Sequence, residues 1–263
     1  MRQRRIAGPT AYPRPLTLYG IRRFLYSGFP AIANHGDRWY TSVLDVPFLL
    51  PYTSGFPMRY GIFGGAFDPI HLGHLLLAET ALRQTELDRV IFVPTGVSPH
   101  RSGKGTYHAS AENRFQMIEA AIAGCEEFLV SRREIDRKEP SFTVETLRYF
   151  KKAFALMQPE FFLILGADMF NDLPNWREAG EVCRLATPLI ACRPGTTLPQ
   201  FEELSRFVSG ERYDEIQRLS LRMPQLEISS TAIRAAVAAG NSIRFQVPRN
   251  VDAYIRKHKL YRP

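Results

Sequence analysis

Residues 60 to 74 read Tyr-Gly-Ile-Phe-Gly-Gly-Ala-Phe-Asp-Pro-Ile-His-Leu-Gly-His. The apolar start predicts a buried strand, the glycine pair Gly64-Gly65 predicts a turn, and the apolar period from Leu72 to about Thr85 predicts a helix. Glycines let the backbone approach a ligand closely, and the start of a helix offers unpaired N–H groups to an anion. The stretch is neither a G-x-G-x-x-G fingerprint nor a P-loop, so its chemistry follows from its own residues.

After Met58 the chain alternates apolar strands with helical patterns. The expected strands cover residues 60–63, 90–93, 128–130, 161–165, 189–191 and 226–228. The expected helices cover residues 72–85, 112–123, 143–156 and 231–239. This alternation predicts parallel strands joined by right-handed crossovers. We expect an α/β fold, a Rossmann-like doubly wound parallel sheet in a single domain over residues 58–263, with ligands beyond the carboxyl ends of the strands.

Residues 1–57 are a different kind of sequence. They contain seven prolines, no sustained period of 3.6 or 2, and seven arginines against two aspartates, which is +5 of the formal net charge of +8. We expect a poorly structured N-terminal extension, either disordered or loosely packed. We favour Met58 as the real or sufficient start, because the first convincing strand follows it directly. A targeting peptide is less favoured, since no apolar segment with a small-residue cleavage site follows the Arg-rich start.

Composition limits the classes of partner. A hydrophobic content of 45% predicts a folded protein with a sizeable core. The residues after 57 carry a formal net charge of only +3 and contain no long basic run. This charge distribution suits the binding of small polyanions such as nucleotides better than the binding of nucleic acid. Three cysteines without C-x-x-C spacing are typical of a reduced, cytoplasmic protein. No apolar stretch is long enough to span a bilayer, so no membrane partner is expected. The oligomeric state stays open, a homo-oligomer included.

Two histidines, His71 and His74, lie three residues apart at the start of the first predicted helix. They therefore share a face and can donate hydrogen bonds to the same polyphosphate. Phosphoryl and nucleotidyl transfer need mainly positioning and charge stabilisation, and no protein nucleophile. The alternative is a plain turn with capping or core histidines, and a metal site on the pair lacks a third ligand with suitable spacing. The complete run favours phosphate chemistry.

The run Gly64 to His74 resembles the G-G-T-F-D-P-x-H-x-G-H signature of the nucleotidyltransferase superfamily, specifically of bacterial nicotinate-mononucleotide adenylyltransferases. Ala66 replaces the usual threonine. Ile228 to Arg234 is similar to the superfamily's I-S-S-T-x-I-R motif, whose hydroxyls and arginine hold the ATP phosphates, although a plain helix cap is the alternative. The catalytic residues that the resemblance implies are His71, His74 and Arg234. The implied ATP-binding residues are Gly64, Gly65, Ala66, Phe67, Gly166, Asp168, Ile228, Ser229, Ser230 and Thr231.

Further segments resemble the substrate-binding regions of the same family. Pro140 to Leu147 is similar to P-S-Y-T-x-x-T-L, where backbone N–H groups bind the nicotinate carboxylate. Asp168 matches an aspartate that accepts hydrogen bonds from ribose hydroxyls, and Trp176 a tryptophan that stacks on the pyridine ring. Val97 to Arg101 resembles a loop ending P-P-H-K, although a solvated basic loop is the alternative. The implied substrate-binding residues are Ser141, Phe142, Thr143, Trp176, His100 and Arg101.

The resemblance implies an adenylyltransferase whose substrates are ATP and nicotinic acid mononucleotide. The products would be nicotinic acid adenine dinucleotide and pyrophosphate, as a step of NAD biosynthesis, with Mg²⁺ carried on ATP and no dedicated metal site in the protein. Enzyme rivals are transferases that act on phosphopantetheine, disfavoured by the segment at Ser141, or on nicotinamide mononucleotide, which only an assay separates. A nucleotide-sensing or RNA-binding protein without catalysis is disfavoured by His71, His74 and Arg234.

Overall fold

The computed structural model describes residues 57–97, 107–192, 204–224 and 226–262, together with two short strands before them. These strands, β1 (Asn34–His35) and β2 (Arg38–Trp39), pair antiparallel as a sheet of their own. The expectation of a poorly structured extension over residues 1–57 otherwise lies outside the described residues.

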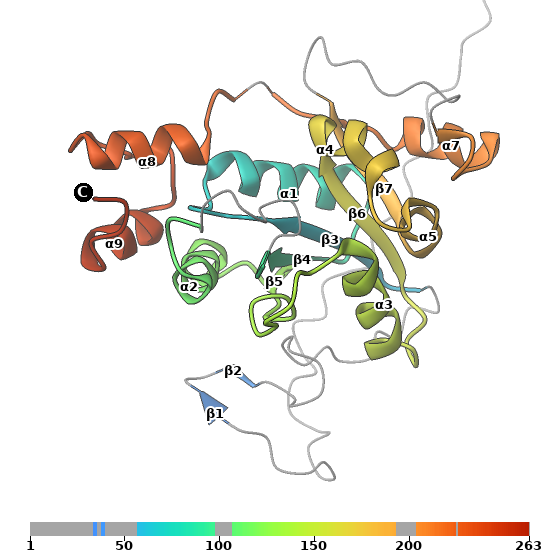
Figure 1. Cartoon of the computed structure of the whole chain (residues 1–263), viewed down its shortest axis with the longest axis horizontal. Helices are drawn as coiled ribbons and strands as arrows, with labels where there is room; N and C mark the ends of the chain where they lie inside the picture. The colour runs from blue at the N-terminus through green and yellow to red at the C-terminus, as the bar shows by residue number, and fades with distance from the viewer. Residues whose placement is uncertain are drawn as a thin grey trace, which may run out of the picture. The chain divides into compact units, whose positions relative to one another are not determined.

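Six parallel strands form the central sheet (Figure 1). Their spatial order is β5 (Phe128–Val130), β4 (Arg89–Pro94), β3 (Arg59–Gly65), β6 (Glu160–Gly166), β7 (Thr187–Cys192) and β8 (Leu221–Arg222). The chain builds outward from β3 in one direction and then returns to β6, on the other side of β3. This is the strand order of a doubly wound dinucleotide-binding sheet, with its switch point between β3 and β6. The predicted fold class is confirmed.

Helices cover both faces of this sheet (Figure 1). In chain order they are α1 (Leu72–Gln84), α2 (Ala111–Ile122), α3 (Thr143–Ala153), α4 (Ala167–Asp172), the 3-10 helix η2 (Leu173–Asn175), α5 (Ala179–Leu185), α7 (Gly210–Arg218), α8 (Ser230–Ala238) and α9 (Arg249–Lys257). Each of the four predicted helices is present, and α3 ends three residues earlier than predicted.

One predicted strand is wrong. Residues 226–228 have no regular secondary structure, and the last strand of the sheet is β8, four residues upstream of them. Pro224 lies between the two segments and cannot donate a ladder hydrogen bond. Leu226 is 38% exposed, so the short apolar pattern does not mark a buried strand. The segment instead leads into the cap of α8.

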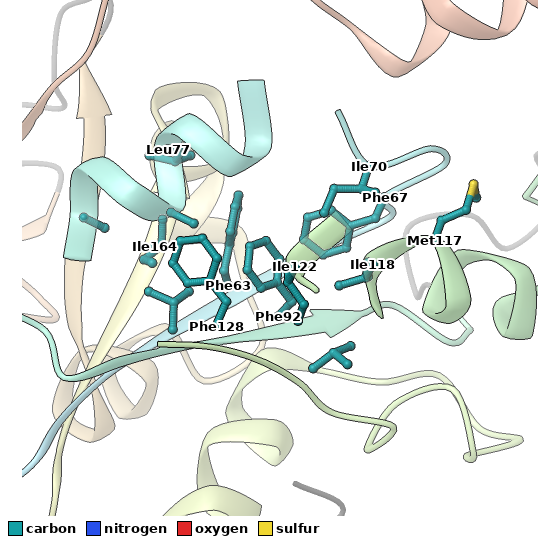
Figure 2. Close-up of a cluster of buried hydrophobic side chains, with 14 of the residues drawn as sticks. Phe63, Phe67, Ile70, Leu77, Phe92, Met117, Ile118, Ile122, Phe128 and Ile164 are labelled. Carbon is teal, nitrogen blue, oxygen red and sulfur yellow. The ribbon is translucent and has the colours of Figure 1, made fainter. Parts of the chain in front are cut away.

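Alternate side chains of the strands fill two separate cores. In β4, Val90 and Phe92 join the cluster under α1, α2, α8 and α9, whereas Ile91 and Val93 join the cluster under α3, α4, α5 and α7. Burial on both faces explains why the strands read as continuous apolar runs. Figure 2 shows the first cluster, with Phe63, Phe92 and Phe128 gathered at its centre.

Candidate active site

The two strands at the switch point both end in glycine. A methyl group placed on Gly64, the residue before the last of β3, or on Gly166, the last of β6, would meet no heavy atom within 4 Å, whereas one on Gly65, the last of β3, would lie 3.0 Å from the Phe67 ring. The protein's own packing therefore does not require glycine at position 64 or 166, and open space lies above these strand ends. In doubly wound sheets this is where ligands bind.

The turn after β3 is anchored in the first core. Phe67 adopts φ 48°, an uncommon value for a residue with a side chain, and its ring is buried at 1% exposure. The ring packs edge-on against Phe63 and Phe92, with ring centroids 5.4 and 5.7 Å away. Figure 2 shows Ile70 beside it at the same end of the cluster. These contacts fix the backbone that separates the glycines from α1.

The histidine pair lies at the start of α1. His71 is the N-cap, its backbone N–H donates to His74 Nδ1 at 3.2 Å, and the two rings stack with centroids 3.7 Å apart. A Cβ on Gly73 would lie 3.1 Å from the His71 ring, closer than most real contacts. The glycine of the H-x-G-H run therefore leaves room for the stacked pair.

Both imidazoles are neutral at pH 7. Burial lowers the pKa of His71 to about 4, and burial together with the nearby His71 holds the pKa of His74 well below its usual 6.5. Because His74 Nδ1 accepts a backbone N–H, the proton of the neutral ring sits on Nε2. His74 can thus donate one hydrogen bond from Nε2 without carrying a positive charge.

The start of α8 is bound to this same turn. Ser230 Oγ donates to the Pro69 carbonyl at 2.8 Å, and Arg234 Nη1 donates to the Asp68 carbonyl at 2.7 Å. Ser229 caps the helix by accepting the Ala232 N–H at 3.2 Å. The structure therefore brings together two segments that lie more than 150 residues apart. The helix-cap alternative holds for Ser229 and is compatible with a ligand at the same helix start.

Similarity to known proteins agrees with this arrangement. The cytidylyltransferase-like family model matches residues 62–236. A Thermus thermophilus protein named "Probable nicotinate-nucleotide adenylyltransferase" is 42% identical over 205 residues, which cover 78% of this chain and all of the relative. A Rubrobacter xylanophilus protein of the same name is 38% identical, covering 78% of this chain and 92% of the relative. The chain belongs to the nicotinate-nucleotide adenylyltransferase family.

Two solved structures share the fold. They are the Plasmodium falciparum nicotinic acid mononucleotide adenylyltransferase complexed with APC, with a TM-score of 0.56 and 18% identity, and the same enzyme complexed with NaAD, with a TM-score of 0.57 and 19% identity. Each comparison covers 78% of this chain and 97% of the other. The family resemblance predicted from the sequence motifs is confirmed, and the chain is a nucleotidyltransferase.

The segments that resemble the family's substrate-binding regions also meet in space. Ser141 N–H donates to the Val97 carbonyl at 3.0 Å, and Phe142 is the N-cap of α3, which begins at Thr143. The guanidinium of Arg177 lies 4.6 Å from the centroid of the Phe142 ring. Its neighbour Trp176 is half-buried and donates from Nε1 to Asp172 Oδ2 at 3.2 Å.

Asp168 lies in the first turn of α4, directly after β6, with its side chain exposed. It therefore stands at the same sheet edge as the open positions at Gly64 and Gly166. His100 and Arg101 lie outside the described residues. Val97, just before them, pairs with Pro140 in an isolated bridge.

Two buried polar side chains hold the site in ways that the sequence motifs did not reveal: Arg114 lies outside every motif, and Asp68 lies within the Gly64–His74 run but had no predicted role. Arg114 of α2 is 1% exposed and donates from Nη1 to the Ala66 carbonyl at 2.8 Å and from Nη2 to the Thr95 carbonyl at 2.7 Å. Asp68 is 3% exposed and accepts the backbone N–H of His108 at 2.8 Å. One sequence signal could have identified Arg114. It lies three residues before Met117 and four before Ile118, so it shares the core-facing side of the predicted helix.

The described residues meet neither the requirements of a metal site nor those of a membrane-spanning helix. There, no group of three or more His, Cys, Asp or Glu side chains is placed to hold a metal ion. No helix among the described residues combines the length and apolar character needed to cross a bilayer.

Proposed function

We propose that this family member transfers the AMP moiety of ATP to nicotinic acid mononucleotide through the residues gathered at the β3–β6 switch point. The observation that carries the proposal is the junction of two helix starts. Ser230 and Arg234 of α8 bond the Pro69 and Asp68 carbonyls, which lie two and three residues before His71. Two helix N-termini therefore converge on one open strand end, which suits a polyphosphate.

The ATP phosphates would lie over Gly64 and the starts of α1 and α8. Arg234 donates from Nη1 to the Asp68 carbonyl and from Nη2 to Thr231 Oγ1 at 3.2 Å. Because a guanidinium has five N–H donors, further donors remain for phosphate. His74 Nε2–H adds a neutral donor in a buried setting. Donors fixed in advance in this way stabilise charge that develops in the transition state.

The proposed reaction needs no nucleophile from the protein. A phosphate oxygen of the mononucleotide attacks the α-phosphorus of ATP, a new P–O–P bond forms, and the bond from the α-phosphorus to its bridging oxygen breaks. Pyrophosphate leaves with that electron pair. The attacking phosphate is already anionic, so no general base has to remove a proton. His71, His74 and Arg234 would stabilise the charge that collects on the α-phosphoryl and bridging oxygens.

Nucleotidyl transfer from ATP usually involves a divalent metal ion, and we propose Mg²⁺ that arrives bound to the ATP phosphates. The donors that the described residues bring to the site fit that arrangement, because they are N–H groups and hydroxyls suited to phosphate oxygens, and no cluster of carboxylates suited to a cation is found among those residues. In this proposal the ion belongs to the substrate. When bound, it would neutralise charge on the phosphate oxygens.

The second substrate would lie between the start of α3 and Trp176. The first N–H groups of a helix have no partner one turn earlier, so those of Thr143 and Val144 are offered to a carboxylate, whereas the Glu145 N–H already donates to the Phe142 carbonyl at 2.9 Å. Arg177, over the Phe142 ring, and Arg137 both pair with Glu145 in the first turn of α3, at 3.2 and 2.9 Å, so two positive charges lie beside one negative charge at that helix start. We propose that the nicotinate carboxylate binds there, with the pyridine ring against Trp176 and the ribose near Asp168.

We also propose residues 58–263 as the catalytic domain of a cytoplasmic enzyme that binds no nucleic acid. Among the described residues, Cys125 and Cys183 are free, which fits a reducing compartment.

A phosphorus label tests the proposed bond change directly. The enzyme is incubated with nicotinic acid mononucleotide and ATP labelled either at the α- or at the γ-phosphate. We expect the α-label in the dinucleotide and the γ-label in pyrophosphate. Release of the γ-label as inorganic phosphate, with no labelled dinucleotide, would contradict adenylyl transfer.

A further inference from the structure

The last residues that the structure describes contact the turn that leads into the histidine pair. Tyr261 Oη donates a hydrogen bond to Asp68 Oδ1 at 2.7 Å, across 193 positions of sequence. The same buried carboxylate accepts the backbone N–H groups of His108 at 2.8 Å and Ala109 at 3.1 Å. Asp68 therefore joins three segments: the C-terminal tail, the approach to α2 and the turn after β3.

The tail reaches Asp68 through an unusual backbone. After α9 the Leu260 N–H bonds the Ile255 carbonyl at 3.0 Å, and both Lys259 (φ 53°) and Tyr261 (φ 62°) adopt the left-handed region. Residues with side chains seldom adopt it, and strained positions of this kind persist only where the surroundings hold them. Figure 1 shows the C-terminus beside α8 and α9, close to the helix that supplies Arg234.

Asp68 also connects to the proposed catalytic groups through its backbone. Its carbonyl accepts Arg234 Nη1, and the carbonyl of the next residue, Pro69, accepts Ser230 Oγ. The same backbone continues within three residues to His71. A shift of the Asp68 carboxylate would therefore displace the carbonyls that orient Arg234 and the backbone that orients the histidines.

We infer that Tyr261 is a positioning residue for adenylyl transfer: its hydroxyl fixes the Asp68 carboxylate and, through it, the geometry of Arg234, His71 and His74. This inference rests on the proposed function, because the reaction supplies the reason for fixing the turn. Burial and the nearby Asp68 raise the pKa of Tyr261, so the hydroxyl keeps its proton and remains a donor.

The first test compares two tyrosines that join the same parts of the molecule. Tyr261→Phe removes only the hydroxyl, which donates to Asp68 Oδ1 at 2.7 Å and also lies 4.0 Å from Met117 Sδ. Tyr254→Phe is the matched control, because Tyr254 Oη donates to Asn113 Oδ1 at 3.0 Å and so also links the C-terminal region to α2, away from Asp68. Both variants and the wild type are assayed with ATP and nicotinic acid mononucleotide at a temperature well below their melting points.

We expect Tyr261→Phe to lower kcat by about tenfold or more, with the KM for ATP within about twofold of wild type, because small misplacement of transition-state groups costs rate before it costs binding. Tyr254→Phe should keep both constants within about twofold. Equal kcat in the two variants would overturn the inference. Asp68→Asn, with Tyr261 intact, should also lower kcat. In the double variant, Tyr261→Phe should lower kcat by a smaller factor than it does alone. A normal kcat in Asp68→Asn would overturn the inference too.

A second measurement does not depend on turnover. Imidazole ¹⁵N resonances report the proton position and surroundings of His71 and His74, and we expect them to shift in Tyr261→Phe and to stay unchanged in Tyr254→Phe. Unchanged resonances in Tyr261→Phe would overturn the inference. A wild-type enzyme that forms no dinucleotide would contradict the proposed function instead, and the ring resonances would still decide the role of Tyr261.

Discussion

The histidine pair illustrates how residue-scale packing sets chemistry. The two rings are stacked, His71 is buried and His74 half-buried, and Gly73 leaves the space beside the His71 ring. Desolvation keeps the imidazoles neutral, so their contribution is that of oriented hydrogen-bond donors rather than fixed cations. The positive charge of the site comes from Arg234 and from the helix N-termini.

Removing either ring should therefore reduce transition-state stabilisation. We expect His71→Ala or His74→Ala to lower kcat by roughly a hundredfold or more, as for loss of a preorganised donor. The control is His258→Ala, because His258 is an exposed histidine that stacks on Tyr254 away from the turn. Steady-state assays on folded variants measure the effect. Normal turnover in a folded double variant of His71 and His74 would contradict the catalytic assignment.

The same burial makes stability depend on pH. The folded-state pKa of His71, about 4, lies below the unfolded value near 6.5, and that of His74 is also depressed. Between these values the unfolded chain binds more protons, so the free energy of unfolding should fall as the pH drops from about 6.5 towards 4, by up to about 1.4 kcal/mol for each unit of pKa difference.

One carboxyl group opposes this trend. Burial raises the pKa of Glu134 to about 6, so its protonation favours the folded state at acid pH. Urea unfolding of the wild type and of Glu134→Gln between pH 7 and 4 measures both contributions. The wild type should lose stability on acidification and Glu134→Gln should lose more. A wild-type stability that rises towards pH 4 would refute neutral buried histidines.

At the scale of elements, prediction from sequence succeeded where a segment carries its own signal. The strands β3, β4 and β6 were predicted because their apolar runs are buried on both faces. Helices α1 and α8 were predicted because each follows a recognisable signal, the glycine turn before α1 and the hydroxyl residues at the start of α8. The helices α4, α5, α7 and α9, of six to nine residues, were not predicted, because so short a segment holds few positions in which a helical period can be recognised and none of the four begins with a motif like that of α8. Arg114 and Tyr261 were missed because their partners lie 48 and 193 positions away.

Gly96 allows the segment that follows β4 to pack closely against the segment that contains Glu134. A Cβ on Gly96, just after β4, would overlap the Glu134 carbonyl oxygen, and a backbone atom cannot move aside without shifting its whole segment. We expect Gly96→Ala to destabilise the fold by about 1 to 3 kcal/mol through overpacking. Gly210→Ala is the control, since a methyl group there meets nothing within 4 Å. Denaturant unfolding compares them, and equal stability of the two variants would contradict the close approach.

On the scale of the whole molecule, the sheet and both cores are built from residues after position 57. A chain that begins at Met58 should therefore fold and transfer AMP with kinetic constants close to those of the full chain. Expression of residues 58–263, followed by circular dichroism and the same assay, checks this. An insoluble or inactive product beside an active full chain would show that the first residues belong to the catalytic domain.

The choice of acceptor is the central claim about the whole enzyme. A helix N-terminus at Phe142 and Thr143 offers N–H donors and a positive dipole end, which suit a carboxylate. The amide of nicotinamide mononucleotide is uncharged and would turn an NH₂ group towards those donors. Such a mismatch costs on the order of 1 to 3 kcal/mol, which corresponds to a preference of about tenfold or more.

The most direct measurement is therefore kcat/KM for the two mononucleotides, in parallel and at fixed ATP and Mg²⁺. We predict that nicotinic acid mononucleotide is used at least about tenfold more efficiently than nicotinamide mononucleotide. Equal efficiency, or a preference for the amide, would contradict the proposed carboxylate site at the start of α3.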